Sequence, residues 1–235
     1  MPAGINCALL LAAGSGARMQ GSVADKILTP IHGIPVFMYS LRAFVACESI
    51  THIGIVYRDA AQQAQLAALV DDDIATKLIW IEGGAERQDS VLNGLQSLPA
   101  DASHTLIHDC ARPLITIAHL ERLIETTRKD SAACLAHPVT DTIKRIPAAD
   151  ALERTTLEDL QRNLLWAMET PQAFRHADIL KAYLHVKAEG LHVTDDCAAA
   201  ASIDIKATLI HNQSPNPKIT TASDLDYVEW LIGKE

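Results

Sequence analysis

The sequence has few aromatic residues and no paired cysteines. Aromatic side chains make up 4% of its 235 residues, and its five cysteines are scattered without any C-x-x-C spacing. An odd, dispersed set of cysteines argues against a disulfide framework and does not predict a zinc site. We therefore expect the cysteines to behave as small buried hydrophobic side chains.

The chain also lacks an excess of positive charge and any apolar run of transmembrane length. It carries 20 Lys and Arg residues against 29 Asp and Glu residues, a formal net charge of −9. This balance argues against a general nucleic-acid surface. The first apolar run is interrupted by Gly14, so it is too short to span a membrane. We expect no nucleic-acid partner, no membrane association and a cytoplasmic location. An anionic ligand would therefore depend on a few local cations.

Internal repeats and low-complexity tracts are absent, and strand-like patterns alternate with helix-like ones. Apolar runs predict buried strands at 5–11, 53–57, 77–81, 105–108 and 132–136, and helical spacing follows most of them. This alternation predicts an α/β fold, a doubly wound and mostly parallel Rossmann-like sheet in a single domain of residues 1–235. Ligands of such sheets bind beyond the carboxyl ends of the strands.

A glycine-bearing turn follows the first predicted strand, within the stretch Leu10–Met19. Glycines such as Gly14 and Gly16 let backbone N–H groups close on an anion. Arg18 and, further on, Lys26 can follow the charge of a phosphate chain. The turn lacks the Gly-Lys-Ser/Thr of a Walker loop and the last small residue of a dinucleotide fingerprint. It predicts nucleotide binding by another class of loop, with an ordinary strand-to-helix connection as the alternative.

Residues 139–165 interrupt the α/β alternation with a polar, charged stretch. A solvated surface excursion is one interpretation, and an arm that reaches another subunit is the other. A polar segment of this length is costly to order unless something binds it. We expect residues 139–165 to form a protruding dimerisation arm.

A short Thr-Asp-Asp turn precedes a later helical pattern. Thr194 is predicted to be the N-cap of that helix, with Asp195 and Asp196 in its first turn. Helix capping alone explains these three residues, so the turn by itself is no evidence of a site.

Four further motifs follow the first loop. They read Gly-Gly-Ala-Glu-Arg-Gln-Asp-Ser-Val at 83–91, His-Asp-Cys-Ala-Arg-Pro at 108–113, Pro-Val-Thr-Asp-Thr-Ile-Lys at 138–144 and Thr-Pro-Gln-Ala-Phe at 170–174. With Arg162-Asn163 and the turn at 194–196, their order and spacing resemble the 2-C-methyl-D-erythritol 4-phosphate cytidylyltransferase family of the non-mevalonate isoprenoid pathway. The resemblance spans about residues 7 to 230. One departure is Asp25, which stands before Lys26 where the family usually has proline.

The resemblance implies a homodimer with the nucleotidyltransferase fold, CTP as donor, a polyol phosphate as acceptor and Mg²⁺ as cofactor. The products would be CDP-methylerythritol and pyrophosphate. It assigns residues as follows: Arg18 and Lys26 to the triphosphate and transition state; Ala13, Gly14 and Gly16 to the phosphates and ribose; Gly84, Ala85 and Ser90 to the base; Asp109 to nucleotide and metal; Arg112, Thr142 and Thr170 to the polyol; Arg162 and Lys218 to the acceptor phosphate. Independently of the resemblance, a carboxylate at a strand end such as Asp109 is a natural hard-oxygen ligand for Mg²⁺.

Two other functions stay open on the sequence alone. A ribitol-5-phosphate cytidylyltransferase would share fold and donor, although the stretch Arg87–Ser90 favours the methylerythritol enzyme. A nucleotide-binding regulatory protein without catalysis is the second, and the retention of Arg18, Lys26, Asp109 and two further cations argues against it. No Ser-His-Asp or Cys-His grouping is recognisable. None is needed, because an acceptor phosphate with a second pKa of about 6 is already ionised at neutral pH.

Overall fold

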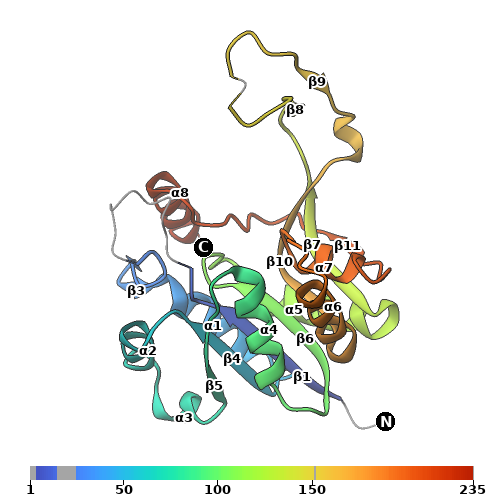
Figure 1. Ribbon diagram of the computed structural model, residues 1–235. Helices are drawn as coiled ribbons and strands as arrows, with labels where there is room; N and C mark the ends of the chain where they lie inside the picture. Colours follow the sequence, from blue (N-terminus) through green and yellow to red (C-terminus); the bar gives the residue numbers. More distant parts are fainter. Residues whose placement is uncertain (1–3, 15–24, 151, 235) are drawn as a thin grey trace.

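A seven-stranded sheet lies at the centre of the molecule (Figure 1). The computed structural model describes residues 4–14, 25–150 and 152–234. The sheet consists of β1 (Ile5–Leu11), β4 (His52–Tyr57), β5 (Leu78–Glu82), β6 (Ala102–Asp109), β7 (Ala132–Pro138), β10 (Trp166–Arg175) and β11 (Thr208–His211). Their order across the sheet is β11-β7-β10-β6-β1-β4-β5. β10 is antiparallel to β6 and β7, and the other pairings in this sheet are parallel. The predicted mostly parallel α/β fold is confirmed.

Helices cover both faces of the sheet, because successive side chains of a buried strand point to opposite sides. On β1, Ala8 and Leu10 belong to one core, whereas Cys7 and Leu9 belong to the other. The first core also contains residues of α1 (Val36–Ala46), α2 (Ala60–Ala67), α5 (Ile117–Asp130) and α8 (Ala222–Ile232). The second contains residues of α4 (Arg87–Ser97), α6 (His176–Ala188) and α7 (Asp196–Ala201). The short helix α3 (Asp72–Ala75) precedes β5, and β2 (Pro30–Ile31) pairs with β3 (Ile34–Pro35) before α1.

The predicted strands and helices are present, with ends that differ by a few residues, and four of the five cysteines are buried. β10 was not predicted, and it contains the Thr-Pro-Gln motif. Its pairing with β7 shifts register between Met168 and Gln172. Pro171 lies within this irregularity, as expected of a residue that cannot donate a ladder hydrogen bond.

The predicted N-cap Thr194 was wrong by one residue. Helix α7 begins at Asp196, and its N-cap is Asp195, whose Oδ1 accepts a hydrogen bond of 2.8 Å from the Ala198 N–H. The carboxylate of Asp196 therefore plays a different part, because it is buried beneath the helix.

Residues 139–165 extend away from the sheet (Figure 1). The two-residue strands β8 (Lys144–Arg145) and β9 (Glu158–Asp159) pair within this segment, and the 3₁₀ turn η2 (Arg162–Leu164) lies near its end. None of its described residues is buried, and the leucines at 152, 157 and 164 are 74%, 57% and 70% exposed. Single exposed leucines are common on protein surfaces, so the dimerisation role expected for this segment stays a prediction.

No helix within the described ranges has both the length and the apolar composition to cross a membrane.

Candidate active site

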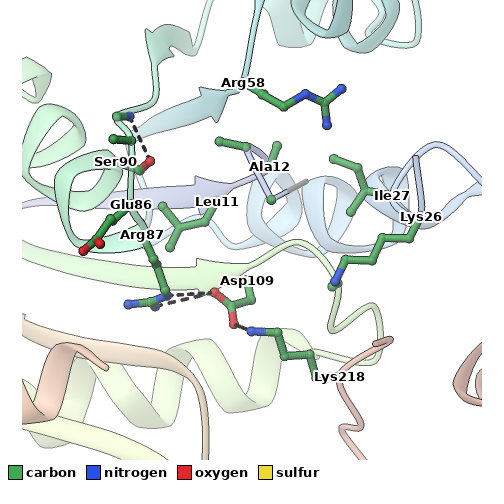
Figure 2. Close-up of a pocket in the computed structure, with 15 residues that line it drawn as sticks. Leu11, Ala12, Lys26, Ile27, Arg58, Glu86, Arg87, Ser90, Asp109 and Lys218 are labelled. Atoms are coloured by element: carbon green, nitrogen blue, oxygen red, sulfur yellow. Dashed lines mark hydrogen bonds and ion pairs between the residues drawn. The ribbon is translucent and has the colours of Figure 1, made fainter. Parts of the chain in front are cut away.

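A cavity of about 410 Å³ opens at the carboxyl ends of β1, β4, β5 and β6 (Figure 2). Its lining comprises Leu11, Ala12, Ala13 and Gly14 after β1; Lys26 and Ile27; Arg58 after β4; Gly84, Ala85, Glu86, Arg87 and Ser90 around the start of α4; Asp109 and Ala111 at the end of β6; and Lys218. This is the edge at which open α/β sheets bind their ligands.

Eight of the predicted site residues line this one cavity: Ala13, Gly14, Lys26, Gly84, Ala85, Ser90, Asp109 and Lys218. Four others do not line it: Arg112, Thr142, Arg162 and Thr170. Gly16 and Arg18 lie outside the described residues, so their predicted roles stay predictions.

The loop between β5 and α4 presents backbone to the cavity. The Gly83 N–H donates to the Tyr57 carbonyl at 2.8 Å, and the Gly84 N–H donates to Ser90 Oγ at 3.0 Å. A Cβ atom on Gly84 would lie 2.3 Å from Cβ of Asp89, so only glycine fits at this close approach. The start of α4 adds the positive end of a helix dipole to this edge. A backbone edge of this kind suits a flat, polar group whose hydrogen-bonding atoms face the loop.

Lys26 is carried by a turn that Asp25 stabilises. Oδ1 of Asp25 accepts from the Ile27 N–H at 3.2 Å, and Oδ2 accepts from Gln62 Nε2 at 2.7 Å. The Lys26 ammonium donates to the Ile219 carbonyl at 2.9 Å, which holds it at the cavity. Asp25 thus fixes the turn before Lys26 by hydrogen bonds.

Asp109 lies at the end of β6 between two cations (Figure 2). Its Oδ2 accepts from Lys218 Nζ at 2.5 Å, and Arg87 approaches Oδ1 at 3.5 Å. Burial alone would raise the pKa of Asp109, but Arg87 and Lys218 outweigh it and hold the pKa well below its usual range. The carboxylate is therefore ionised at neutral pH, and Lys218 reaches the cavity from its loop.

A buried polar network lies behind Asp109. Oγ1 of Thr170 accepts from the Asp109 N–H at 3.0 Å and lies 3.1 Å from His108 Nδ1. His108 Nε2 lies 3.2 Å from the Arg112 carbonyl oxygen. Burial lowers the pKa of His108 to about 4, so the imidazole is neutral and has one donor and one acceptor nitrogen. The network is satisfied when the Thr170 hydroxyl donates to Nδ1 and Nε2–H donates to Arg112. Thr170 therefore supports the backbone at Asp109 instead of lining the cavity.

Arg112 lines a second cavity, of about 520 Å³, which also includes Lys218. Its Nη1 donates to the Asn216 carbonyl at 2.6 Å, and its Nη2 donates to the Met168 carbonyl at 3.3 Å. The side chain of Asn216 is held in turn by the buried Glu169, at 2.9 Å. Arg112 thereby anchors the loop that brings Lys218 to Asp109.

Comparison with known proteins identifies the family. A family model described as 2-C-methyl-D-erythritol 4-phosphate cytidylyltransferase matches residues 6–234. The chain belongs to this family. A protein of that name from Synechococcus elongatus is 38% identical over 225 residues, which are 95% of this chain and 94% of the relative. One from Bacillus velezensis is 34% identical over 225 residues, again 95% of this chain and 94% of the relative.

Solved structures have the same fold. The crystal structure of 4-diphosphocytidyl-2C-methyl-D-erythritol synthase from Anaerococcus prevotii has a TM-score of 0.83 at 24% identity, covering 98% of this chain and 97% of that one. The crystal structure of the 2-C-methyl-D-erythritol 4-phosphate cytidylyltransferase from Francisella tularensis has a TM-score of 0.80 at 24% identity. It covers 96% of this chain and 99% of that one. The family's fold therefore extends over nearly the whole chain.

Two predicted site residues lie on the protruding arm of this cytidylyltransferase-family chain. Thr142 is exposed, and Arg162 Nη1 donates to the Thr140 carbonyl at 3.0 Å. Neither residue lines the cavity at Asp109 or the one at Arg112. The chain on its own does not bring them to Asp109.

The residues at the cavity fit a magnesium ion held mainly by substrate. Among the residues that the structure describes, no three His, Cys, Asp or Glu side chains gather as a metal-binding group. Mg²⁺ is commonly bound by one or two carboxylates together with substrate phosphates, rather than by an all-protein cage. Asp109, ionised and facing the cavity, matches that requirement.

Sequence reasoning missed the part played by Asp196. Its carboxylate forms a bidentate ion pair with Arg87, at 2.9 Å for both contacts. Arg87 and Asp196 each belong to motifs that the sequence displays, but no local pattern connects positions 109 residues apart. The capping explanation was sufficient for the Thr-Asp-Asp turn and concealed this contact.

Proposed function

We propose that this chain transfers the cytidylyl group of CTP to 2-C-methyl-D-erythritol 4-phosphate and releases pyrophosphate. Family membership over residues 6–234 supports this assignment. The observation that carries it in the structure is the convergence of Lys26, Asp109 and Lys218 with the backbone edge at Gly84 in one cavity at the strand ends.

The reaction needs charge compensation more than proton transfer. A phosphate oxygen of the acceptor attacks the α-phosphorus of CTP, a new P–O bond forms, and the bond to the β-phosphate oxygen breaks. The attacking group has a second pKa of about 6 and is ionised at neutral pH, so no general base is required. Cations must offset the repulsion between two anions and the charge on the oxygens around phosphorus.

Cations from separate segments of this chain would meet that need. We assign Lys26, together with Arg18, to the triphosphate and the transition state. Lys218 precedes Ile219, whose carbonyl accepts from Lys26, and its own ammonium contacts the carboxylate of Asp109. It would bind the acceptor phosphate, and Arg112 would hold its loop and assist with the polyol. Thr170 would act only indirectly, by supporting the backbone of Asp109.

The nucleoside would lie along the backbone edge. We assign the base to Gly84, Ala85 and Ser90, because their groups can approach a small pyrimidine closely. The phosphates and ribose would contact the first loop at Ala13, Gly14 and Gly16.

We further propose Mg²⁺ as the cofactor, with Asp109 as its protein ligand. When bound, the ion supplies neutralisation of the charge on the triphosphate oxygens. Asp109 holds a full negative charge at the cavity because Arg87 and Lys218 favour its ionised form.

The acceptor site would be completed by a second copy of the chain. Thr142 and Arg162 lie on the arm, away from their own cavity, and the arm exposes three leucines. A homodimer in which each arm reaches the neighbouring cavity would bring Arg162 to the acceptor phosphate and Thr142 to the polyol. The cytoplasmic location expected from the sequence stays a prediction.

An acceptor and nucleotide panel tests the proposed function. Pyrophosphate release would be measured with CTP, UTP, ATP and GTP, each with methylerythritol phosphate and with ribitol 5-phosphate. We expect release only with CTP and methylerythritol phosphate in the presence of Mg²⁺. Preference for ribitol 5-phosphate would overturn the acceptor assignment. CTP binding without release on any acceptor would instead indicate a nucleotide-binding protein without catalysis.

A further inference from the structure

The buried carboxylate of Asp196 joins three helices behind the cavity. It lies in the first turn of α7 and is 0% exposed. Arg87, at the start of α4, donates Nη1 to Oδ1 and Nη2 to Oδ2, both at 2.9 Å. The hydroxyl of Tyr183, on α6, donates to Oδ1 at 2.6 Å. The bidentate geometry fixes the guanidinium in both position and orientation.

Arg87 contacts the carboxylates of both Asp196 and Asp109, at different distances. Its contacts with Asp196 are 2.9 Å, whereas Nε and Nη2 each lie 3.5 Å from Oδ1 of Asp109. Charge-assisted hydrogen bonds are normally about 2.7–2.9 Å long. Arg87 is therefore fully bonded to Asp196 and only loosely bonded to Asp109. The Oδ1 atom of Asp109 keeps most of its capacity to accept another cation.

Gln88, the next residue, also attaches the start of α4 to the segment before α7. Gln88 Nε2 donates to the Leu191 carbonyl at 3.2 Å, and Gln88 Oε1 accepts from the Val193 N–H at 3.1 Å. Residues 87–88 and 191–196 are thus joined by side-chain hydrogen bonds on two sides. The distance from Arg87 to Asp109 is set by this attachment.

We propose that Asp196 is a positioning residue for nucleotidyl transfer: by holding Arg87 in a bidentate pair, it keeps the guanidinium from closing on Asp109 and leaves that carboxylate available to a divalent cation. The inference rests on the proposed function and adds to it a residue that touches no substrate. Without the charge of Asp196, Arg87 would pair directly with Asp109 and compete with the metal.

The substitution Asp196→Asn tests this role, and Asp195→Asn is its matched control. Asp195 is the adjacent carboxylate; it accepts from the Ala198 N–H and from Gln172 Nε2 rather than from Arg87, and it caps α7, a position that Asn also suits. Mn²⁺ would replace Mg²⁺ as a spectroscopic probe, with its affinity for the enzyme–CTP complex measured by electron paramagnetic resonance without acceptor. We expect Asp196→Asn to weaken Mn²⁺ affinity about 10- to 100-fold. The Mg²⁺ concentration for half-maximal turnover should rise in parallel, and Asp195→Asn should leave both unchanged.

A purely structural role gives a different result. In that case Asp196→Asn would lower thermal stability and kcat at every Mg²⁺ concentration while Mn²⁺ affinity stayed at the wild-type value, and the proposal would be wrong. If Asp196→Asn does not fold, Arg87→Lys carries the test, because an ammonium cannot form the bidentate pair with Asp196 that holds the cation away from Asp109, and Mn²⁺ affinity should again fall. Unchanged Mn²⁺ affinity in Arg87→Lys would then overturn the proposal.

The Mn²⁺ affinity is measured with CTP and without acceptor, so a failure of this proposal can be told apart from a failure of the proposed function. A wild-type protein that binds Mn²⁺ and CTP but forms no product with methylerythritol phosphate would refute the proposed function. The comparison of Asp196→Asn with Asp195→Asn would still decide whether Asp196 governs the metal site.

Discussion

At the scale of single residues, the end of β6 holds two neighbouring ionisable groups in opposite charge states. Asp109 stays charged because Arg87 and Lys218 compensate its burial. His108 is fully buried, and burial lowers its pKa to about 4. Asp109 thus presents a negative charge to the cavity, whereas neutral His108 supports the network behind it.

Lys26→Ala should reduce turnover severely while preserving the fold. The side chain lines the cavity from a turn held by Asp25, so its removal creates little disturbance in the core. Losing one stabilising cation is expected to cost about 3 kcal/mol in the transition state, or roughly a hundredfold in kcat. Lys77→Ala, at an exposed position away from the cavity, is the control. Arg18→Ala should behave like Lys26→Ala, and near-normal pyrophosphate release by either variant would remove that residue from catalysis.

Asp109→Asn should impair the response to Mg²⁺, because an amide oxygen is a poorer ligand for a hard cation than a carboxylate. A Mg²⁺ titration of pyrophosphate release should require higher metal concentrations than the wild type. Asp59→Asn provides a control, since Asp59 caps α2 outside the cavity. Superimposable titrations of Asp109→Asn and wild type would leave Asp109 with a structural role only.

His108 should make the folded state sensitive to mild acid. Its pKa falls from 6.5 to about 4 on folding, so between these values the unfolded chain takes up a proton that the folded chain does not. The free energy of unfolding therefore decreases as the pH falls through this window, by about 3 kcal/mol at most from this group. His108→Gln removes this titration.

Urea unfolding of both proteins between pH 7 and 4 checks the prediction. The stability advantage of the wild type over His108→Gln should shrink as the pH falls. If the free energy of unfolding depended on pH in the same way in both proteins, the pKa of His108 would be the same in the folded and unfolded states, and the prediction would be wrong.

At the scale of elements, periodic apolar patterns were enough to predict β1, α4 and α5, since each buries one face against the sheet. β10 was not predictable in this way, because Pro171 interrupts its ladder and neighbouring strands supply the pairing. The cavity residues Lys26 and Asp109 were predictable from motifs at strand ends. The contact between Arg87 and Asp196 was not, because it depends on how α4 and α7 pack rather than on either local sequence.

The end of α5 offers a test of helix termination. Ser131 follows the helix with φ 69°, in the left-handed region that disfavours a side chain. Ser131→Gly should raise the free energy of unfolding by about 0.5–1 kcal/mol. Ser202→Gly is the matched control, because Ser202 follows α7 with φ −63° and gains no such relief. Urea unfolding would measure both, and a Ser131→Gly protein less stable than wild type would contradict the expectation.

At the scale of the whole molecule, the sheet and its helices form the cavity at Asp109, while residues 139–165 extend away from the sheet (Figure 1). The arm holds Thr142 and Arg162, and none of its described residues is buried. In the proposed dimer, cytidylyl transfer takes place where the cavity of one chain meets the arm of another. A solution measurement of molecular mass should accordingly give a dimer.

The most direct test of a site shared between two chains is complementation between two inactive variants. Arg18→Ala removes a cation from the nucleotide side, and Arg162→Ala removes one from the arm. When subunits exchange, a mixed dimer contains one site in which both arginines are intact if Arg162 acts across the interface. Mixing the two variants should then restore CDP-methylerythritol formation from CTP and methylerythritol phosphate. If every site uses its own Arg162, each mixed site lacks one arginine, and continued inactivity after proven subunit exchange would contradict the shared site.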